Sequence, residues 1–207
     1  MAANNTAILI MAAGTGGHVF PALAIARKLS ERGIEIHWLA TESGMENRLL
    51  AGTGYELHKI SVKGLRGKGL VKMLLAPFMI ITATLQSLSV IHRVKPSCVL
   101  GMGGYIAGPG GLAAKLKGVP LVIHEQNAVA GLTNRLLAKF ANQVFEAFPA
   151  TFDKSQKVVF AGNPVRAEIA ALFVRSEEKS PEQPLHLLVL GGSQGAAAIN
   201  SVVPLLL

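Results

Sequence analysis

The sequence contains very little of several residue types that define common classes of protein. It has one cysteine, Cys98, which excludes a disulfide scaffold and a cysteine-rich metal site and favours a reducing cytoplasm. It has one aspartate, Asp153, among 12 acidic residues. Sugar-nucleotide enzymes that hold a metal through an Asp-x-Asp pair, Asp-dyad hydrolases and EF-hand proteins all need more than one. We therefore expect no metal site and no cofactor.

Aromatic and charged residues are also scarce, at 5% and 15% of the 207 residues, whereas half of the chain is hydrophobic. Few aromatics argue against a base-stacking nucleic-acid surface, and the hydrophobic content predicts a sizeable core. The charge is unbalanced, since 20 Lys and Arg give a formal net charge of +8. We expect an anionic partner, either a phosphate-bearing substrate or an acidic membrane face, and no nucleic acid.

One uncharged stretch, residues 73–91, is long enough to raise a membrane span. Pro77 interrupts it early and polar residues run through its second half, so we expect a buried helix of an α/β fold instead. The alternative is an apolar surface ringed by cations, which suits a peripheral protein on anionic lipid. The first residues carry no basic cluster followed by a long apolar run, so no secretory signal is expected.

Short apolar runs alternate with helical patterns, which is typical of βαβ units. Strands are expected at residues 7–12, 35–40, 56–60, 97–100, 120–123 and 157–161. The helix after the first strand is clear, since Val19, Leu23 and Ala26 share one face and Gly33 ends it. The sequence therefore predicts an α/β fold with a Rossmann-like, doubly wound parallel sheet in the order 3-2-1-4-5.

The composition changes near the C-terminus. Residues 174–184 are polar and contain two prolines, which indicates a linker between a first domain at 1–173 and a second unit at 185–207. The second unit is expected to hold one strand, a glycine loop and part of a helix. One βα unit cannot bury both faces, so we expect a piece of a longer protein that associates with itself through this segment.

Two glycine loops follow strands that are neighbours at the switch point of the predicted sheet. They are residues 14–17 after the first strand and 101–104 after the fourth, and residues 124–127 after the fifth strand border them. Facing loops that cradle anions suit a diphosphate, although tight turns need glycine in any case. A dinucleotide site with Glu42 as the ribose acid is disfavoured, because Val19 stands where the third glycine belongs.

His18 and Glu125 are the acid/base candidates in this crevice, at a helix N-terminus and a strand end. The alternatives are that His18 caps the helix and that Glu125 pairs with a cation. We expect no role for the remaining histidines, because their spacing does not suit a metal. They are His37, His58, His92 and His186.

Seven motifs in order resemble the MurG family, the N-acetylglucosaminyltransferases of peptidoglycan synthesis. They are GTGGHVFP at 14–21, GLRGKG at 64–69, GMGGY at 101–105, HEQN at 124–127, GLTN at 131–134, GNPVR at 162–166 and GGSQGA at 191–196. The resemblance implies a GT-B fold, with the acceptor on the first Rossmann-like domain and the nucleotide sugar mostly on the second. It implies metal-independent, inverting transfer of N-acetylglucosamine from UDP-N-acetylglucosamine to the 4-hydroxyl of the muramoyl sugar of lipid I, forming lipid II.

The resemblance also assigns roles to individual residues. It implies donor contacts from Thr15, Gly16, Gly17, Asn127, Arg166 and Ser193, and an acceptor diphosphate cradle of Gly14, Gly16, Gly17, Gly103, Gly104 and Tyr105. It matches His18 to the group that deprotonates the acceptor, with Glu125 as rival or partner. It implies a peripheral location at the cytoplasmic face of the bacterial cell membrane, docked through Lys68, Lys72, Leu74, Leu75, Phe78 and Met79.

The sequence departs from the family at its end, because the second domain stops after its first glycine loop. We therefore expect no turnover from these residues alone. A non-catalytic module that binds the acceptor or the membrane stays open, and a nicotinamide-dependent oxidoreductase is the weaker alternative.

Overall fold

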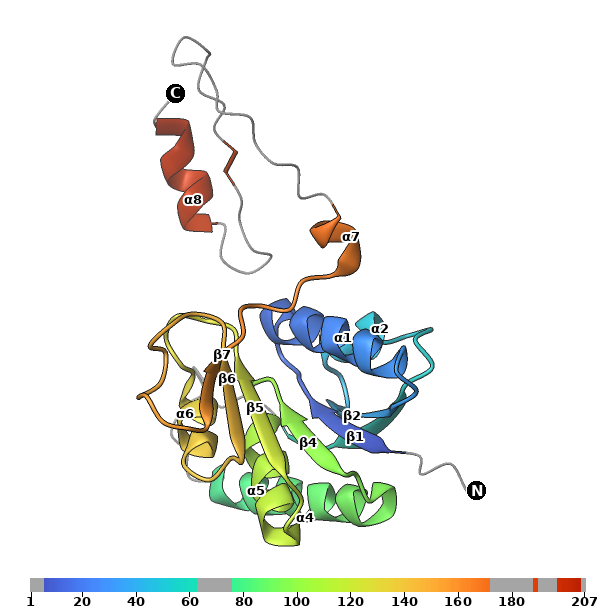
Figure 1. The fold of residues 1–207 in the computed structure, drawn as a ribbon. Helices are drawn as coiled ribbons and strands as arrows, with labels where there is room; N and C mark the ends of the chain where they lie inside the picture. The colour runs from blue at the N-terminus through green and yellow to red at the C-terminus, as the bar shows by residue number, and fades with distance from the viewer. Residues whose placement is uncertain (1–5, 63–75, 172–187, 190–196, 206–207) are drawn as a thin grey trace. The chain divides into compact units, whose positions relative to one another are not determined.

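The computed structural model describes residues 6–62, 76–171, 188–189 and 197–205. The chain divides into two compact units, Met1–Leu172 and Phe173–Leu207. The first unit is built on a seven-stranded parallel sheet in the order β3-β2-β1-β4-β5-β6-β7 (Figure 1). Its strands are β1 (Ala7–Met11), β2 (Glu35–Thr41), β3 (Glu56–Ile60), β4 (Cys98–Gly101), β5 (Leu121–Glu125), β6 (Gln143–Glu146) and β7 (Val158–Phe160).

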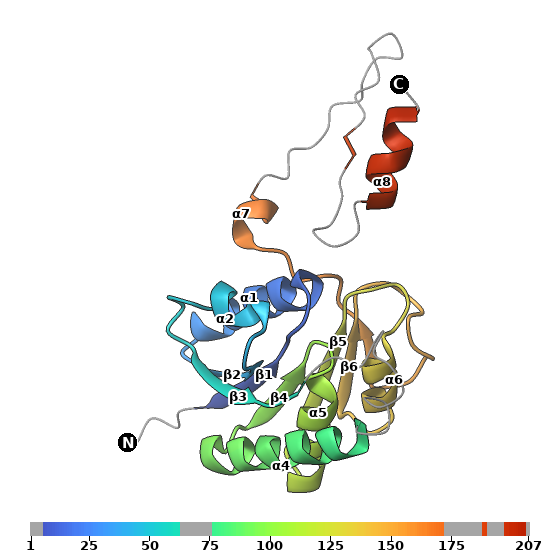
Figure 2. The same cartoon turned by 180° about the vertical axis from the view of Figure 1, so that it is seen from behind.

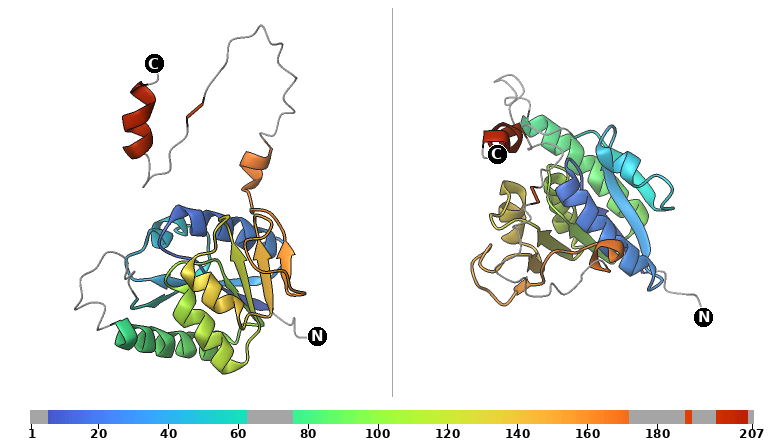
Figure 3. Two further views of the ribbon diagram at one scale, coloured as in Figure 1. Left: turned by 90° about the vertical axis from the view of Figure 1, so that its left-hand side faces the viewer. Right: turned by 90° about the horizontal axis from the view of Figure 1, so that it is seen from above.

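Helices cover both faces of this sheet, as expected when each strand leads into a right-handed crossover. One face carries α1 (Gly16–Ser30) and α2 (Met45–Leu49), and the other carries α4 (Ala76–Val94), α5 (Ala107–Lys117) and α6 (Leu132–Ala138) (Figures 1 and 2). The left panel of Figure 3 shows α1 above the strands and α4 and α5 below them. A short helix, α7 (Ala167–Ala170), follows β7.

Two hydrophobic clusters hold these layers together, one on each face of the sheet. Leu9, Met11 and Leu39 belong to the cluster under α4 and α5. Ile10 and Trp38 belong to the cluster under α1 and α2. Both faces of the central strands are therefore buried, which explains why these strands are continuous apolar runs in the sequence.

The predicted α/β fold and the 3-2-1-4-5 strand order are confirmed. The sequence missed β6, which pairs with β5 on one side and β7 on the other. This strand has only four residues, Gln143, Val144, Phe145 and Glu146, so a period of two is too short to distinguish it from a loop.

The helix expected within residues 73–91 is α4, and Pro77 lies in its first turn, where proline is tolerated. One side of α4 is buried, but Phe78, Ile81 and Leu85 are 70%, 56% and 61% exposed. The helix therefore combines a core face with an exposed apolar row. Within residues 6–62, 76–171, 188–189 and 197–205, no helix is long and apolar enough to cross a membrane.

Several expectations fall outside the described residues. These are the linker at 174–184, Ser193 with its glycine loop, the motif at 64–69, and the membrane candidates Lys68, Lys72, Leu74 and Leu75. In the second unit the described elements are α8 (Ala197–Val202) and a 3-10 turn, η1 (Val203–Leu205). Of the strand expected at 185–190, Leu188 and Val189 are described, and neither is in a strand.

Candidate active site

The loops after β1 and β4 touch at the carboxyl ends of the strands. Gly103 and Gly104 both have positive φ, 93° and 77°, and both lie against the ring of His18. A Cβ on Gly103 would lie 3.0 Å from Cε1 of that ring, and a Cβ on Gly104 would lie 2.5 Å from the carbonyl oxygen of Ala13. The ring of Tyr105 packs in the same way over Gly14. The structure thus brings the two predicted glycine loops together, with no room for side chains at the contact.

The N-terminus of α1 opens at this contact. Thr15 is the N-cap residue, but its side chain makes no capping hydrogen bond, and the first turn of α1 has no acidic residue. The amides at the start of a helix have no partner within the helix and carry a partial positive charge. Exposed Gly17 and half-buried Gly16 supply such amides here, so an anion is favoured at this point.

Glu125, at the end of β5, is 1% exposed and accepts four hydrogen bonds. Oε1 accepts from the backbone amide of Asn127 at 3.1 Å and its side-chain Nδ2 at 2.9 Å. Oε2 accepts from the amide of Gly131 and from Nδ2 of Asn134, both at 3.0 Å. All four donors are neutral, and together they occupy the lone pairs of the carboxylate. Glu125 therefore holds the shape of the 125–134 loop, and this arrangement favours His18 as the base.

A chain of hydrogen bonds fixes the protonation pattern of His18. Nδ1 of His18 lies 2.9 Å from Oε1 of Gln126. The Gln126 amide can be oriented only one way, because its Nε2 donates to the carbonyl oxygen of His124 at 2.9 Å. Since Oε1 can only accept, Nδ1 of His18 must carry the proton. Nε2 of a neutral His18 is then the nitrogen that is able to take a proton.

The same chain continues to the segment beyond β7. Nε2 of His124 donates to the carbonyl oxygen of Gly162 at 2.9 Å, and its Nδ1 accepts from Nε2 of Gln126 at 3.1 Å. Burial lowers the pKa of His124, against smaller opposing effects of the Gly162 hydrogen bond and the Glu125 charge. A neutral His124 matches this pattern, because its Nδ1 then offers a lone pair to Gln126.

The remaining predicted donor contacts lie on the exposed side of these loops. The guanidinium of Arg166 lies 5.1 Å from the centre of the Phe20 ring, and that ring packs against Gly16. Arg166 is exposed, as are Thr15 and Asn127, so all three are accessible to a ligand. A cation–π contact holds the Arg166 fork beside the start of α1.

Comparison with protein families identifies the family of this chain. Residues 8–146 match the glycosyltransferase family 28 N-terminal domain. The chain belongs to glycosyltransferase family 28. Two relatives named UDP-N-acetylglucosamine--N-acetylmuramyl-(pentapeptide) pyrophosphoryl-undecaprenol N-acetylglucosamine transferase, from Pseudomonas savastanoi pv. phaseolicola and Pseudomonas syringae pv. tomato, are each 56% identical over 202 residues. In each case the match covers 95% of this chain and 55% of the relative.

A solved structure of Acinetobacter baumannii MurG is 52% identical, with a TM-score of 0.67 over 74% of this chain and 44% of that one. The family 28 chain therefore spans about half the length of the curated relatives it matches.

Sequence reasoning missed three polar residues of this family 28 site. No role was expected for His124, Gln126 or Asn134, although the first two stand in the HEQN motif and the third in GLTN. Asn134 is 1% exposed and its Nδ2 lies near both Glu125 and Gly103. The signal in the sequence was a run of polar residues, His124 to Asn127, at the end of a buried strand, whereas Asn134 lies within α6 and had no such signal.

Other polar residues do not join the site. Gly110 and Gly111 lie within α5, where a Cβ would strike Met11 and Leu137, so close helix packing explains them. Glu42 is exposed and accepts a hydrogen bond from Oγ of Ser61 at 2.7 Å. His37 and His58, for which no role was expected, lie side by side, and the distance between their nearest nitrogens is 3.0 Å.

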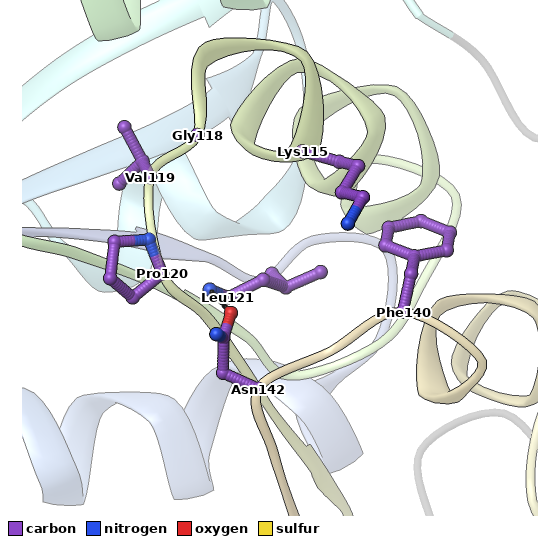
Figure 4. Close-up of a pocket in the computed structure, with 7 residues that line it drawn as sticks. All are labelled: Lys115, Gly118, Val119, Pro120, Leu121, Phe140 and Asn142. Atoms are coloured by element: carbon purple, nitrogen blue, oxygen red, sulfur yellow. Dashed lines mark hydrogen bonds between the residues drawn. The ribbon is translucent and has the colours of Figure 1, made fainter.

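A hollow of about 150 Å³ lies at the opposite rim of the sheet, around the start of β5 (Figure 4). Its lining includes Lys115, Pro120, Phe140 and Asn142. The Asn142 side chain already accepts a hydrogen bond from the Leu121 amide at 2.9 Å. In doubly wound folds ligands bind at the carboxyl ends of strands, so we place the site with the glycine loops and not here.

Proposed function

We propose that this chain supplies the acceptor side of a family 28 N-acetylglucosaminyltransferase. The reaction moves N-acetylglucosamine from UDP-N-acetylglucosamine to the 4-hydroxyl of the muramoyl sugar of lipid I and yields lipid II. The names of the relatives at 56% identity support this substrate pair. The observation that carries the proposal is the fixed tautomer of His18 at the junction of two glycine loops.

The proposed chemistry is a single displacement with inversion. Nε2 of His18 takes the proton of the acceptor hydroxyl as its oxygen bonds to the anomeric carbon. The bond from that carbon to the diphosphate breaks, and its electron pair leaves with UDP. Gln126 keeps the ring in the basic tautomer, and Glu125 acts through the loop that it holds.

The acceptor and the donor would both bind at the carboxyl ends of the strands, and Gly16 and Gly17 would contact both of them. Proposed acceptor diphosphate contacts are Gly14, Gly16, Gly17, Gly103, Gly104 and Tyr105. Proposed donor contacts are Thr15, Gly16, Gly17, Asn127, Arg166 and, outside the described residues, Ser193. Backbone amides at the start of α1 and the guanidinium of Arg166 would stabilise the negative charge of the diphosphates without a metal.

A peripheral position at the cytoplasmic membrane face belongs to the same proposal. Phe78 is exposed on the first turn of α4 and Met79 is half-buried beside it. Ile81 and Leu85 extend the apolar row along the helix, at a spacing of three and four residues. The net charge of +8 would favour anionic lipid at such a surface.

Binding of a lipid I analogue with a shortened lipid tests the acceptor site on the chain itself. Gly103→Ala pushes a methyl group against His18, whereas Gly118→Ala adds one in open space at a similarly positive φ of 67°. Both variants place alanine at a positive φ, and Gly118→Ala is the control without a new contact to His18. We expect Gly103→Ala to weaken binding at least about tenfold, the effect of about 1.4 kcal/mol, and Gly118→Ala to leave it unchanged.

Equal binding by both variants would show that the acceptor does not bind at these loops. No turnover is expected from these residues alone, so binding of the analogue decides whether the acceptor site lies on this chain. Transfer of labelled N-acetylglucosamine in the same samples would show catalysis and exclude a non-catalytic acceptor-binding module.

A further inference from the structure

Two neighbouring strands carry the same short pattern, a glutamate and a histidine separated by one residue. In β2 the pair is Glu35 and His37, and in β3 it is Glu56 and His58. Side chains alternate along a strand, so each pair lies on one face. The parallel register sets His37 opposite Glu56 and Leu39 opposite His58. Two histidines and two glutamates therefore meet on the α4 side of the sheet.

The facing atoms of this cluster are close. Nδ1 of His37 lies 3.0 Å from Nε2 of His58, and the two rings are stacked with centres 5.2 Å apart. The Glu56 carboxylate lies 3.5 Å from Nδ1 of His37 through Oε2 and 3.7 Å from Nε2 of His58 through Oε1. Both imidazoles are buried, at 6% exposure each, while the Glu56 side chain is 64% exposed.

These side chains are placed for three corners of a tetrahedral metal site. Zn²⁺ binds imidazole nitrogen and carboxylate oxygen at about 2.0–2.1 Å, which places tetrahedral ligand atoms about 3.3 Å apart. One ligand atom from each of His37, Glu56 and His58 lies within 4.8 Å of the other two, and the nearest nitrogens of the two histidines are 3.0 Å apart. The exposed Glu56 carboxylate would rotate to bring one of its oxygens to the tetrahedral spacing.

Glu35 supplies the outer contact that such sites usually contain. Its Oε1 lies 3.2 Å from Nε2 of His37, the ring nitrogen that faces away from the cluster. A carboxylate there holds the proton on Nε2 and leaves the Nδ1 lone pair for a metal. Arg93 of α4 also acts on the pKa of His58, and its effect is smaller than that of the Glu56 charge.

We propose that His37, His58 and Glu56 bind a divalent transition metal of the zinc class, with Glu35 orienting His37. Two imidazoles and one carboxylate suit Zn²⁺ better than Mg²⁺ or Ca²⁺, which prefer oxygen ligands alone. A water would complete the coordination on the exposed side. The ion would fasten β3, an edge strand of the sheet, to β2. The site lies toward the amino ends of these strands, whereas the glycine loops lie at the carboxyl ends, so its role is structural.

Calorimetric titration of the metal-free 207-residue chain with Zn²⁺ tests the proposal. We expect one saturable site, weakened at least about tenfold by His58→Ala and by Glu56→Gln, and by about 10–100-fold by Glu35→Gln. His92→Ala is the matched control, because His92 is exposed on α4 outside the cluster, and it should bind like the parent chain. Zn²⁺ should also raise the melting temperature of the parent chain but not that of Glu56→Gln.

Glu56→Gln keeps the test decisive if His58→Ala fails to fold, because this exposed, isosteric change leaves the buried rings in place. Zn²⁺ affinity that is the same in the parent chain and Glu56→Gln would overturn the proposal. The proposal would also be overturned if His92→Ala bound Zn²⁺ more weakly than the parent chain while Glu56→Gln bound it equally well.

Discussion

Replacing Glu125 with glutamine separates a loop-holding role from a catalytic one. Glutamine keeps one oxygen, which can serve the two Asn127 donors or those of Gly131 and Asn134, and turns an NH₂ group toward the other two. Two hydrogen bonds to a charged acceptor are then lost. At about 1.5–3 kcal/mol each, the free energy of unfolding should fall by about 3–6 kcal/mol. That is a large part of the about 5–15 kcal/mol that holds a typical domain together.

The chain has a built-in reporter for this measurement. Trp38 is its one tryptophan, and it is fully buried on β2 with Nε1 donating to the Ala12 carbonyl at 3.0 Å. Its fluorescence follows unfolding of the first unit alone. With a slope of about 2 kcal/mol per molar urea, the midpoint should fall by about 1.5–3 M.

The control is Glu31→Gln, which removes an exposed pair with Lys28 at 2.8 Å. Exposed pairs of this kind contribute about 0–1 kcal/mol, so its midpoint should stay close to that of the parent chain. If Glu125→Gln and Glu31→Gln unfold at the same urea concentration, the four hydrogen bonds do not hold the loop and Glu125 regains its place as a candidate base.

Two further predictions concern the loop contact and pH. Gly104→Ala should lower the melting temperature more than Gly118→Ala. Both changes place alanine at a positive φ, which costs about 1–2 kcal/mol, but only Gly104→Ala also drives a Cβ into the Ala13 carbonyl oxygen. Equal melting temperatures would contradict the close contact. Burial lowers the pKa of His124 in the folded state, so the unfolded chain, with a histidine pKa of about 6.5, binds the proton more readily. Stability from this group is complete above that pH and is lost as the pH falls below it. The urea midpoint should therefore drop between pH 7.5 and 5.5, less steeply in His124→Gln than in His92→Gln, and parallel slopes would refute the assignment.

The sheet order and the meeting of the two glycine loops were predictable, because both follow from which strands lead into which helices. Long apolar runs and glycine turns mark those connections in the letters of the sequence. The β6 strand was not predictable, since a segment of four residues with polar ends is too short to show the alternation of apolar and polar residues that marks a strand. The same holds for Gly110 and Gly111, because a glycine that admits a neighbouring helix looks like one that forms a turn.

The polar network lay beyond sequence reasoning for a different reason. His18 and Gln126 are 108 residues apart, and His124 and Gly162 are 38 residues apart. Their contacts depend on side-chain direction at the ends of β1 and β5, which spacing does not encode. His37 and His58 met for a similar reason, because the register between β2 and β3 decides which residues are opposite.

Buried glutamates recur where strands end. Besides Glu125, Glu146 at the end of β6 accepts the amides of Ala150 and Phe152 at 3.2 and 3.1 Å, and Glu46 accepts the Thr41 amide at 2.8 Å. Each of these buried carboxylates accepts hydrogen bonds from backbone amides at the end of a strand or in the loop that follows it. Loops supported in this way keep their shape while their outward residues change.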